Sequence, residues 1–110
     1  MHFANTPEPP YYAVIFTSQK TDKDSKGYTL AADFMVELAS KQIGFLGVES
    51  VRDQNGIGIT VSYWDSLDAI KLWKENVSHK QVQEKGKKDW YSSYTTRICK
   101  VERDYTNNNH

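Results

Sequence analysis

The sequence predicts one small α+β domain whose strands and helices follow the order β-α-β-β-α-β. Two observations carry this prediction. The segment from Phe45 to Trp64 has the pattern of a β-hairpin, and two other stretches repeat apolar residues at the steps of an amphipathic helix. At 110 residues the chain has room for one hydrophobic core, and therefore for one domain.

The composition is that of an ordinary globular protein, with 38% hydrophobic and 25% charged residues. Fourteen basic residues balance fourteen acidic ones, which argues against nucleic-acid binding, since phosphate recognition normally needs a basic excess. The single cysteine, Cys99, excludes an internal disulfide and favours a cytoplasmic protein. No apolar run is long enough to span a bilayer, so we expect no membrane segment.

The chain divides into three parts. Residues 1–10 form a proline-rich leader without the basic-then-apolar order of a signal peptide, residues 11–105 form the domain, and residues 106–110 form a polar tail.

The first strand is expected at Tyr11–Gln19, where aromatic and β-branched residues dominate. Tyr12 and Phe16 fall on one face with Val14, and the opposite face is also fairly apolar, which suits a central strand. The charged segment Lys20–Lys26, closed by Gly27, is interpreted as a loop.

The first helix is expected at Leu30–Gln42. Apolar residues recur there at three- and four-residue steps, acidic and basic residues share the opposite side, and no proline interrupts. Gly44 is suited to a left-handed cap near the end of this helix.

The hairpin consists of the runs Phe45–Asp53 and Gly56–Trp64. The Asn55-Gly56 pair between them tolerates the positive φ that a tight hairpin needs. The second run alternates apolar and small or polar residues, which indicates a sheet with one face on the core and its other face on something else.

A second helix follows, capped by Asp65 or Ser66, with apolar residues at helical spacing: Ala69, Ile70, Trp73 and Val77. Ser78 resembles a second cap, so we expect the helix to break and restart near His79 and to run to Gly86.

The last strand is expected at Ser93–Tyr105. On it we read Cys99 as a small core residue and Arg97 as pairing with a carboxylate across the sheet. Trp90 and Tyr91, which precede this strand, are read mainly as packing residues near the end of the sheet that holds the candidate residues below.

This order of elements is the ferredoxin-like arrangement, a four-stranded antiparallel sheet with both helices on one face. The uncovered face invites a second copy, so we expect a homodimer. A cavity between sheet and helices is the natural ligand site.

Three residues in the second half of the chain are candidates for chemistry. Trp64 has one N–H donor that could reach a quinone or phenol oxygen, and Trp73 could press on a flat ligand; a core role is the alternative for both. His79 could move a proton or bind haem iron, or it could face solvent. We expect no metal site, because His2, His79 and His110 are far apart.

Three segments resemble the antibiotic biosynthesis monooxygenase family: Gly44–Ser50, Gly58–Trp64 and Asp65–Ala69. The first carries a Gly-Phe-Leu-Gly opening, and the last two form a Tyr-Trp-x-Ser-x-x-Ala strand-to-helix turn. The resemblance covers roughly Tyr11–Tyr105 and implies a homodimeric α/β barrel. It also implies, for some members, oxygenation of phenols or quinols without flavin or metal.

The resemblance can be followed residue by residue. Trp64 matches the strand tryptophan of the polyketide-oxidising members, whereas Thr60 stands at their asparagine position and Ile70 at their helix tyrosine position. In the haem-degrading branch Trp73 matches the helix tryptophan and His79 lies close after it. Thr17 and Ser18 stand where that branch has an asparagine.

We therefore hypothesise a cofactor-independent monooxygenase-like protein that acts on a small aromatic or quinol with O₂. Trp64 and His79 are the candidate catalytic residues, His79 by assisting deprotonation, and the candidate substrate-binding residues are Trp73, Tyr12, Phe16 and Thr60. One alternative is a haem-binding, haem-degrading monooxygenase. The other is a dimeric small-molecule-binding protein without catalysis.

Overall fold

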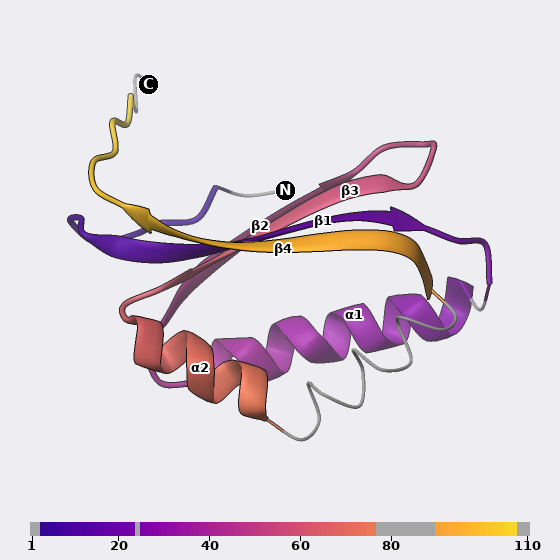
Figure 1. The fold of residues 1–110 in the computed structure, drawn as a ribbon, viewed down its shortest axis with the longest axis horizontal. Helices are drawn as coiled ribbons and strands as arrows, with labels where there is room; N and C mark the ends of the chain where they lie inside the picture. The colour runs from indigo at the N-terminus through magenta and orange to yellow at the C-terminus, as the bar shows by residue number, and fades with distance from the viewer. Residues whose placement is uncertain (1–2, 24, 77–89, 108–110) are drawn as a thin grey trace.

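A computed structural model describes residues 3–23, 25–76 and 90–107. Its elements follow the predicted order β-α-β-β-α-β (Figure 1). In chain order they are β1 (Tyr11–Lys20), α1 (Ser25–Ser40), β2 (Phe45–Arg52), β3 (Ile57–Trp64), α2 (Leu67–Glu75) and β4 (Tyr91–Val101).

The four strands form one antiparallel sheet in the order β2-β3-β1-β4. Both helices lie on the same side of this sheet, α1 running along it and α2 across one end (Figure 1). The predicted ferredoxin-like fold is thus confirmed, and β1 is a central strand as expected. Among the described residues, neither helix has the length and apolar character needed to cross a membrane.

The hairpin between β2 and β3 closes through Asp53. The Asp53 carboxylate accepts hydrogen bonds from the backbone N–H groups of Asn55 and Ile57, both at 2.9 Å. Gly56 has φ +88°, the left-handed conformation that the Asn-Gly pair predicts. The predicted hairpin is therefore confirmed, with strand ends that differ by one residue.

Helix α1 begins at Ser25, five residues before the predicted start, so reading all of Lys20–Lys26 as a loop was wrong. The apolar period marks only the part of a helix that packs on the sheet. In the first turns of α1, Ser25, Lys26 and Thr29 are exposed, Gly27 is accommodated, and Tyr28 is the one aromatic side chain that packs inward, so these turns carry no apolar period.

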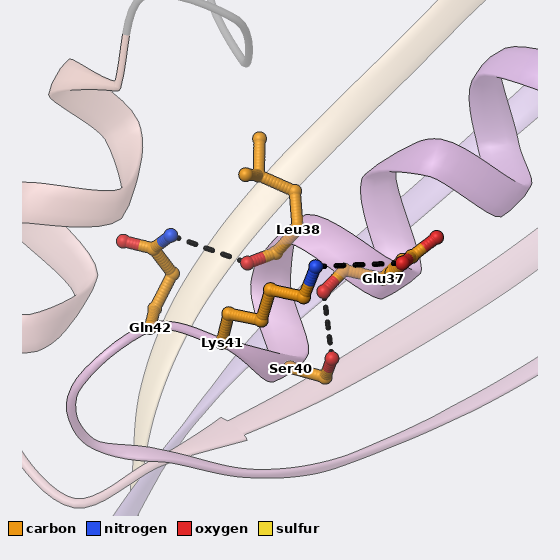
Figure 2. Close-up of polar contacts among 5 residues, drawn as sticks. All are labelled: Glu37, Leu38, Ser40, Lys41 and Gln42. Atoms are coloured by element: carbon orange, nitrogen blue, oxygen red, sulfur yellow. Dashed lines mark hydrogen bonds and ion pairs between the residues drawn. The ribbon is translucent and has the colours of Figure 1, made fainter.

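The C-terminal end of α1 is closed by its own side chains (Figure 2). The Ser40 hydroxyl donates to the Glu37 carbonyl at 2.6 Å, and the Gln42 side-chain amide donates to the Leu38 carbonyl at 3.2 Å. The bond from Ser40 satisfies a carbonyl at the helix end, and the bond from Gln42 adds to the one that the Leu38 carbonyl accepts from the Lys41 N–H at 3.2 Å. The helix ends at Ser40, two residues before the predicted end, and Gly44 adopts φ +88° in the following turn.

Helix α2 is capped by Ser66, whose hydroxyl accepts a hydrogen bond from the Ala69 N–H at 3.1 Å. Ala69, Ile70 and Trp73 are buried, as their spacing predicts. The rest of the predicted pattern lies outside the described residues: Val77, the second cap Ser78, His79 and the end at Gly86.

Strand β4 is shifted toward the N-terminus relative to the prediction. It ends at Val101, which pairs with Tyr11, the first residue of β1. Pro9 and Pro10 precede that residue and have no N–H to continue the ladder, so the chain after Val101 finds no strand partner.

Two predictions for side chains of β4 did not hold. Cys99 is exposed rather than in the core, because it lies on an edge strand and on the face opposite the helices. Arg97 has no carboxylate within ion-pair distance in the described ranges, where the one ion pair joins Lys41 to Glu37 (Figure 2).

Candidate functional site

The side of the sheet that faces the helices, here called the inner face, carries the residues considered for chemistry. Strand register places Tyr12 directly opposite Trp64 and Phe16 directly opposite Thr60. Residues opposite one another share a face, so all four lie on the inner face. The two pairs are four positions apart, which is about 13 Å along the strand.

One end of the inner face is filled by a packed group, here called the tryptophan core. Trp64 is completely buried; it stacks on Trp73 with ring centroids 5.8 Å apart and meets the edge of Phe45 at 5.5 Å. Its indole N–H donates to the Ser62 hydroxyl at 2.9 Å. Tyr12 packs against this group. The single donor of Trp64 is therefore engaged within the protein.

The other half of the inner face carries a different group, here called the aromatic patch: Phe16, Tyr28, Tyr91 and Tyr94. Phe16 lies 5.3 Å from both the Tyr91 and the Tyr94 ring, measured between centroids, and Tyr28 meets Tyr91 edge-on at 5.9 Å. Beside Phe16, the hydroxyl of Thr60 lies 2.7 Å from that of Ser50. These rings and hydroxyls are partly exposed, unlike the tryptophan core.

Arg52 lies at the border of the aromatic patch. Its guanidinium donates to the Ser18 hydroxyl at 2.9 Å, to the Tyr28 hydroxyl at 3.3 Å and to the Gly56 carbonyl. It also lies over the Tyr28 and Tyr91 rings, 5.7 and 5.9 Å from their centroids. One arginine of the edge strand β2 thus joins the central strand β1, the hairpin turn and α1.

Tyr91 shares this environment. Burial raises the pKa of its phenol, and the neighbouring Tyr28 hydroxyl raises it further, while the positive charge of Arg52 acts in the opposite direction. At neutral pH Tyr91 therefore keeps its proton and can serve as a hydrogen-bond donor.

The structure separates the predicted site residues into two groups. Trp64, Trp73 and Tyr12 come together in the tryptophan core, whereas Phe16 and Thr60 lie beside the aromatic patch. His79 lies outside the described residues.

Trp90 and Tyr91 do pack, as expected, since Trp90 is buried and Tyr91 is half-buried. Their predicted position was wrong. Tyr91 pairs with Lys20, at the end of β1 opposite the Tyr12–Trp64 pair, because β4 runs antiparallel to β1.

Sequence reasoning missed Arg52 and Tyr28. A signal for Arg52 was present in the hairpin: counting back from the turn pairs it with Gly58, the one residue of β3 without a side chain. An arginine opposite a glycine on the inner face has room to lie across the strand.

The opposite side of the sheet, here called the open face, holds a hollow of about 790 Å³ beside the N-terminal segment. Two tyrosine–carboxylate pairs line it, each 2.6 Å between oxygens: Tyr63 donates to Glu49, and Tyr11 donates to Asp104. Burial, and then these hydrogen bonds, raise the pKa of both phenols.

A metal or a haem would need several ligating side chains gathered at one place. In the ranges that the structure describes, no three potential metal-binding side chains gather. All three histidines fall outside those ranges, and Trp73 is only 8% exposed within the tryptophan core. The histidine that a haem would need as an axial ligand thus lies outside the described ranges, and we derive no step through that group.

A sequence model of the antibiotic biosynthesis monooxygenase family matches residues 10–85. The chain is also 57% identical over 100 residues to the uncharacterized protein YqjZ of Bacillus subtilis (strain 168), covering 91% of this chain and 87% of that protein.

Solved structures share the fold at low sequence identity. Rv0793 from Mycobacterium tuberculosis superposes with a TM-score of 0.74 at 10% identity, over 88% of this chain and 99% of the other. An antibiotic biosynthesis monooxygenase superposes with a TM-score of 0.70 at 12% identity, over 80% and 95%. These structural similarities support the fold.

Proposed function

Because this chain belongs to the antibiotic biosynthesis monooxygenase family, we propose that it oxygenates a small electron-rich aromatic, such as a quinol, with O₂ and without flavin or metal. The family supports a monooxygenase-like or small-molecule-binding role.

The observation that carries the proposal is the aromatic patch beside the Thr60–Ser50 hydroxyl pair. A flat ring that lies on Phe16 would also meet Tyr94, since the Phe16 and Tyr94 rings are 5.3 Å apart at 35°. The two hydroxyls, 2.7 Å apart, can donate to or accept from a phenolic oxygen at the ring's edge. Partly exposed rings with a few polar groups are typical of ligand sites.

For a quinol the reaction balances without an added reductant. The quinol supplies four electrons to O₂; one oxygen atom forms a new C–O bond on the ring, and the other leaves as water. The product is a hydroxyquinone, which has lost the two hydroxyl hydrogens and the ring hydrogen at the new bond and keeps the hydrogen of the new hydroxyl. The chain's residues need only hold the ring, position its hydroxyl and admit O₂.

In this proposal the tryptophan core serves as a rigid end wall. Trp64 and Trp73 fix the position of Tyr12, and Tyr12 shares the inner face of β1 with Phe16. His79 remains the sequence-based candidate for assisting deprotonation of the substrate hydroxyl.

We also propose that the working form is a homodimer joined through the open faces of the sheets. Three exposed apolar residues support this: Val51, Ile57 and Ile59. Register places Val51 opposite Ile59, so that they share the open face and leave a bare apolar strip there. A two-fold dimer that packs these strips against each other would remove both strips from water.

Oxygen uptake with a panel of quinols, compared with anaerobic incubation, tests the proposed reaction. Wild-type protein should consume O₂ with at least one quinol, and Phe16→Ala should lower turnover. Thr17→Val is the matched control, because Thr17 neighbours Phe16 on β1 but points to the opposite face. A panel without O₂-dependent turnover would reject the proposal.

A non-catalytic small-molecule-binding protein is the second candidate. The observation that favours it is the tryptophan core, in which both candidate tryptophans are buried and stacked on each other. Quinol binding measured by tryptophan fluorescence, together with an absence of O₂ uptake, would identify this role.

A further inference from the structure

Arg52 is a half-buried cation held by neutral groups. Its guanidinium donates to the hydroxyls of Ser18 and Tyr28 and to the carbonyl of Gly56. A guanidinium has five N–H donors, so two remain after these three hydrogen bonds. Ser18 is only 4% exposed, which shows that this hydrogen-bond network reaches into the sheet.

No carboxylate balances this charge within the described ranges, where Lys41–Glu37 is the one ion pair and lies at the C-terminal end of α1 (Figure 2). A second cation is close by instead. The Lys20 ammonium lies 5.0 Å from the centroid of the Tyr28 ring, over which Arg52 also lies. Positive charge that is partly removed from water and not paired with an acid favours the binding of an anion.

The position of Arg52 relates this charge to the proposed substrate. Ser50 and Arg52 are two residues apart on β2, opposite Thr60 and Gly58. Two residues along a strand span about 7 Å, and both side chains point to the inner face. A ring lying on Phe16 near the Ser50–Thr60 pair would therefore reach Arg52 with a substituent on its edge.

From this arrangement, and resting on the function proposed above, we infer that the site takes its aromatic substrate as an oxygen-centred anion bound to Arg52. A phenolate and an aryl carboxylate are the two classes of aromatic that carry such an anion. The rings of Tyr28 and Tyr91 would flank the anion, and Arg52 would be an anion-binding residue.

Such binding would assist the proposed oxygenation. A phenolate gives up an electron to O₂ more readily than the neutral phenol. Arg52 would favour the phenolate, with the phenol proton passing to solvent. An aryl carboxylate would instead be oriented by Arg52, leaving its ring beside Phe16.

Binding of matched charged and neutral probes tests the inference without requiring turnover. Benzoate and benzamide have similar shapes and differ in charge, and their affinities can be measured by calorimetry. Wild-type protein should bind benzoate about tenfold more tightly than benzamide. A phenol is tested with para-nitrophenol. Its binding to the wild-type protein should increase the absorbance band of the phenolate.

Substitutions then assign the preference to Arg52. Arg52→Gln should bring the benzoate-to-benzamide ratio close to one, and Arg52→Lys should keep part of the preference. Arg103→Gln is the matched control, since it removes an exposed arginine that follows β4. It should leave the ratio unchanged.

Equal binding of benzoate and benzamide by the wild-type protein, or binding of neither, would overturn the inference. So would an Arg52→Gln variant that is folded and keeps the full preference. The comparison of benzoate and benzamide binding by the wild-type protein tests the inference even if Arg52→Gln does not fold. Anion preference without O₂ uptake would reject only the proposed function, whereas O₂ uptake without anion preference would reject only this inference.

Discussion

The guanidinium of Arg52 lies in the space that a side chain on Gly58 would occupy. A Cβ atom built on Gly58 would stand 2.5 Å from the Arg52 Cζ and 2.7 and 2.8 Å from its two terminal nitrogens. The two residues are direct partners across the β2–β3 hairpin. The missing side chain on β3 therefore permits an arginine to lie flat on the inner face.

Gly58→Ala should displace the Arg52 guanidinium and leave the strands in place, because the clash is with the far end of a flexible side chain. Losing the hydrogen bond to the buried Ser18 hydroxyl should lower the free energy of unfolding by about 1–3 kcal/mol. Benzoate binding should weaken by about tenfold.

Calorimetry and urea unfolding measure both effects of Gly58→Ala. Gly47→Ala is the control for benzoate binding, because Gly47 pairs with Tyr63 on the open face of the same sheet and its new Cβ would meet Ala4 instead of Arg52. Benzoate affinity should be unchanged in that control. Wild-type benzoate affinity in Gly58→Ala would show that the guanidinium position does not govern binding.

Trp64→Ala should lower the free energy of unfolding by about 3–5 kcal/mol, because it empties the centre of the tryptophan core. Chemical unfolding followed by circular dichroism measures the loss. Leu72→Ala, on the exposed side of α2, should change stability by no more than about 0.5 kcal/mol. A Trp64 variant as stable as the wild type would contradict the packing described here.

Alkaline pH should destabilise the fold partly through Tyr63. Burial and its hydrogen bond to Glu49 raise the pKa of Tyr63 above the ordinary 10.0. Below pH 10.0 the phenol is protonated in both folded and unfolded chains, and its contribution to stability is complete. Above that pH the unfolded chain loses the proton first, so the free energy of unfolding falls as pH rises.

Urea unfolding over a range of alkaline pH, with wild-type protein and Tyr63→Phe, measures this contribution. Tyr63→Phe should show a shallower fall in stability above pH 10.0. Identical slopes for the two proteins would mean that Tyr63 does not contribute.

Ile59→Lys should convert the proposed dimer to a folded monomer, since it places a charge in the apolar strip of the open face. Light scattering coupled to gel filtration gives the mass. Leu72→Lys, an exposed apolar residue on α2, should leave the dimer intact. A monomeric wild-type protein, or a dimeric Ile59→Lys variant, would reject the open-face interface.

The local signals in the sequence were sufficient for the fold. The Asn55-Gly56 turn and the Ser66 cap each depend on a few neighbouring residues, and both are present as predicted. The start of α1 was missed because exposed helical turns carry no apolar period. Cys99 was misplaced because alternation alone does not say which face of an edge strand is covered.

The site was only partly predictable, since it depends on contacts between distant segments. Alternation in β3 separates Ile59 from Thr60 but does not reveal that the polar side faces the helices. In the sequence, Arg52 is simply a charged residue before a turn. Only the fold brings Tyr28 and Tyr91, distant along the chain, to its two sides.

The most direct test of the proposed oxygenation uses isotopically labelled O₂ and a quinol that the wild-type protein turns over. Mass spectrometry should find one labelled oxygen atom in the hydroxyquinone and the other in water, with product formation reduced in Phe16→Ala and unchanged in Thr17→Val. A product without the label, or equal product from wild-type protein and Phe16→Ala, would contradict oxygenation at the aromatic patch.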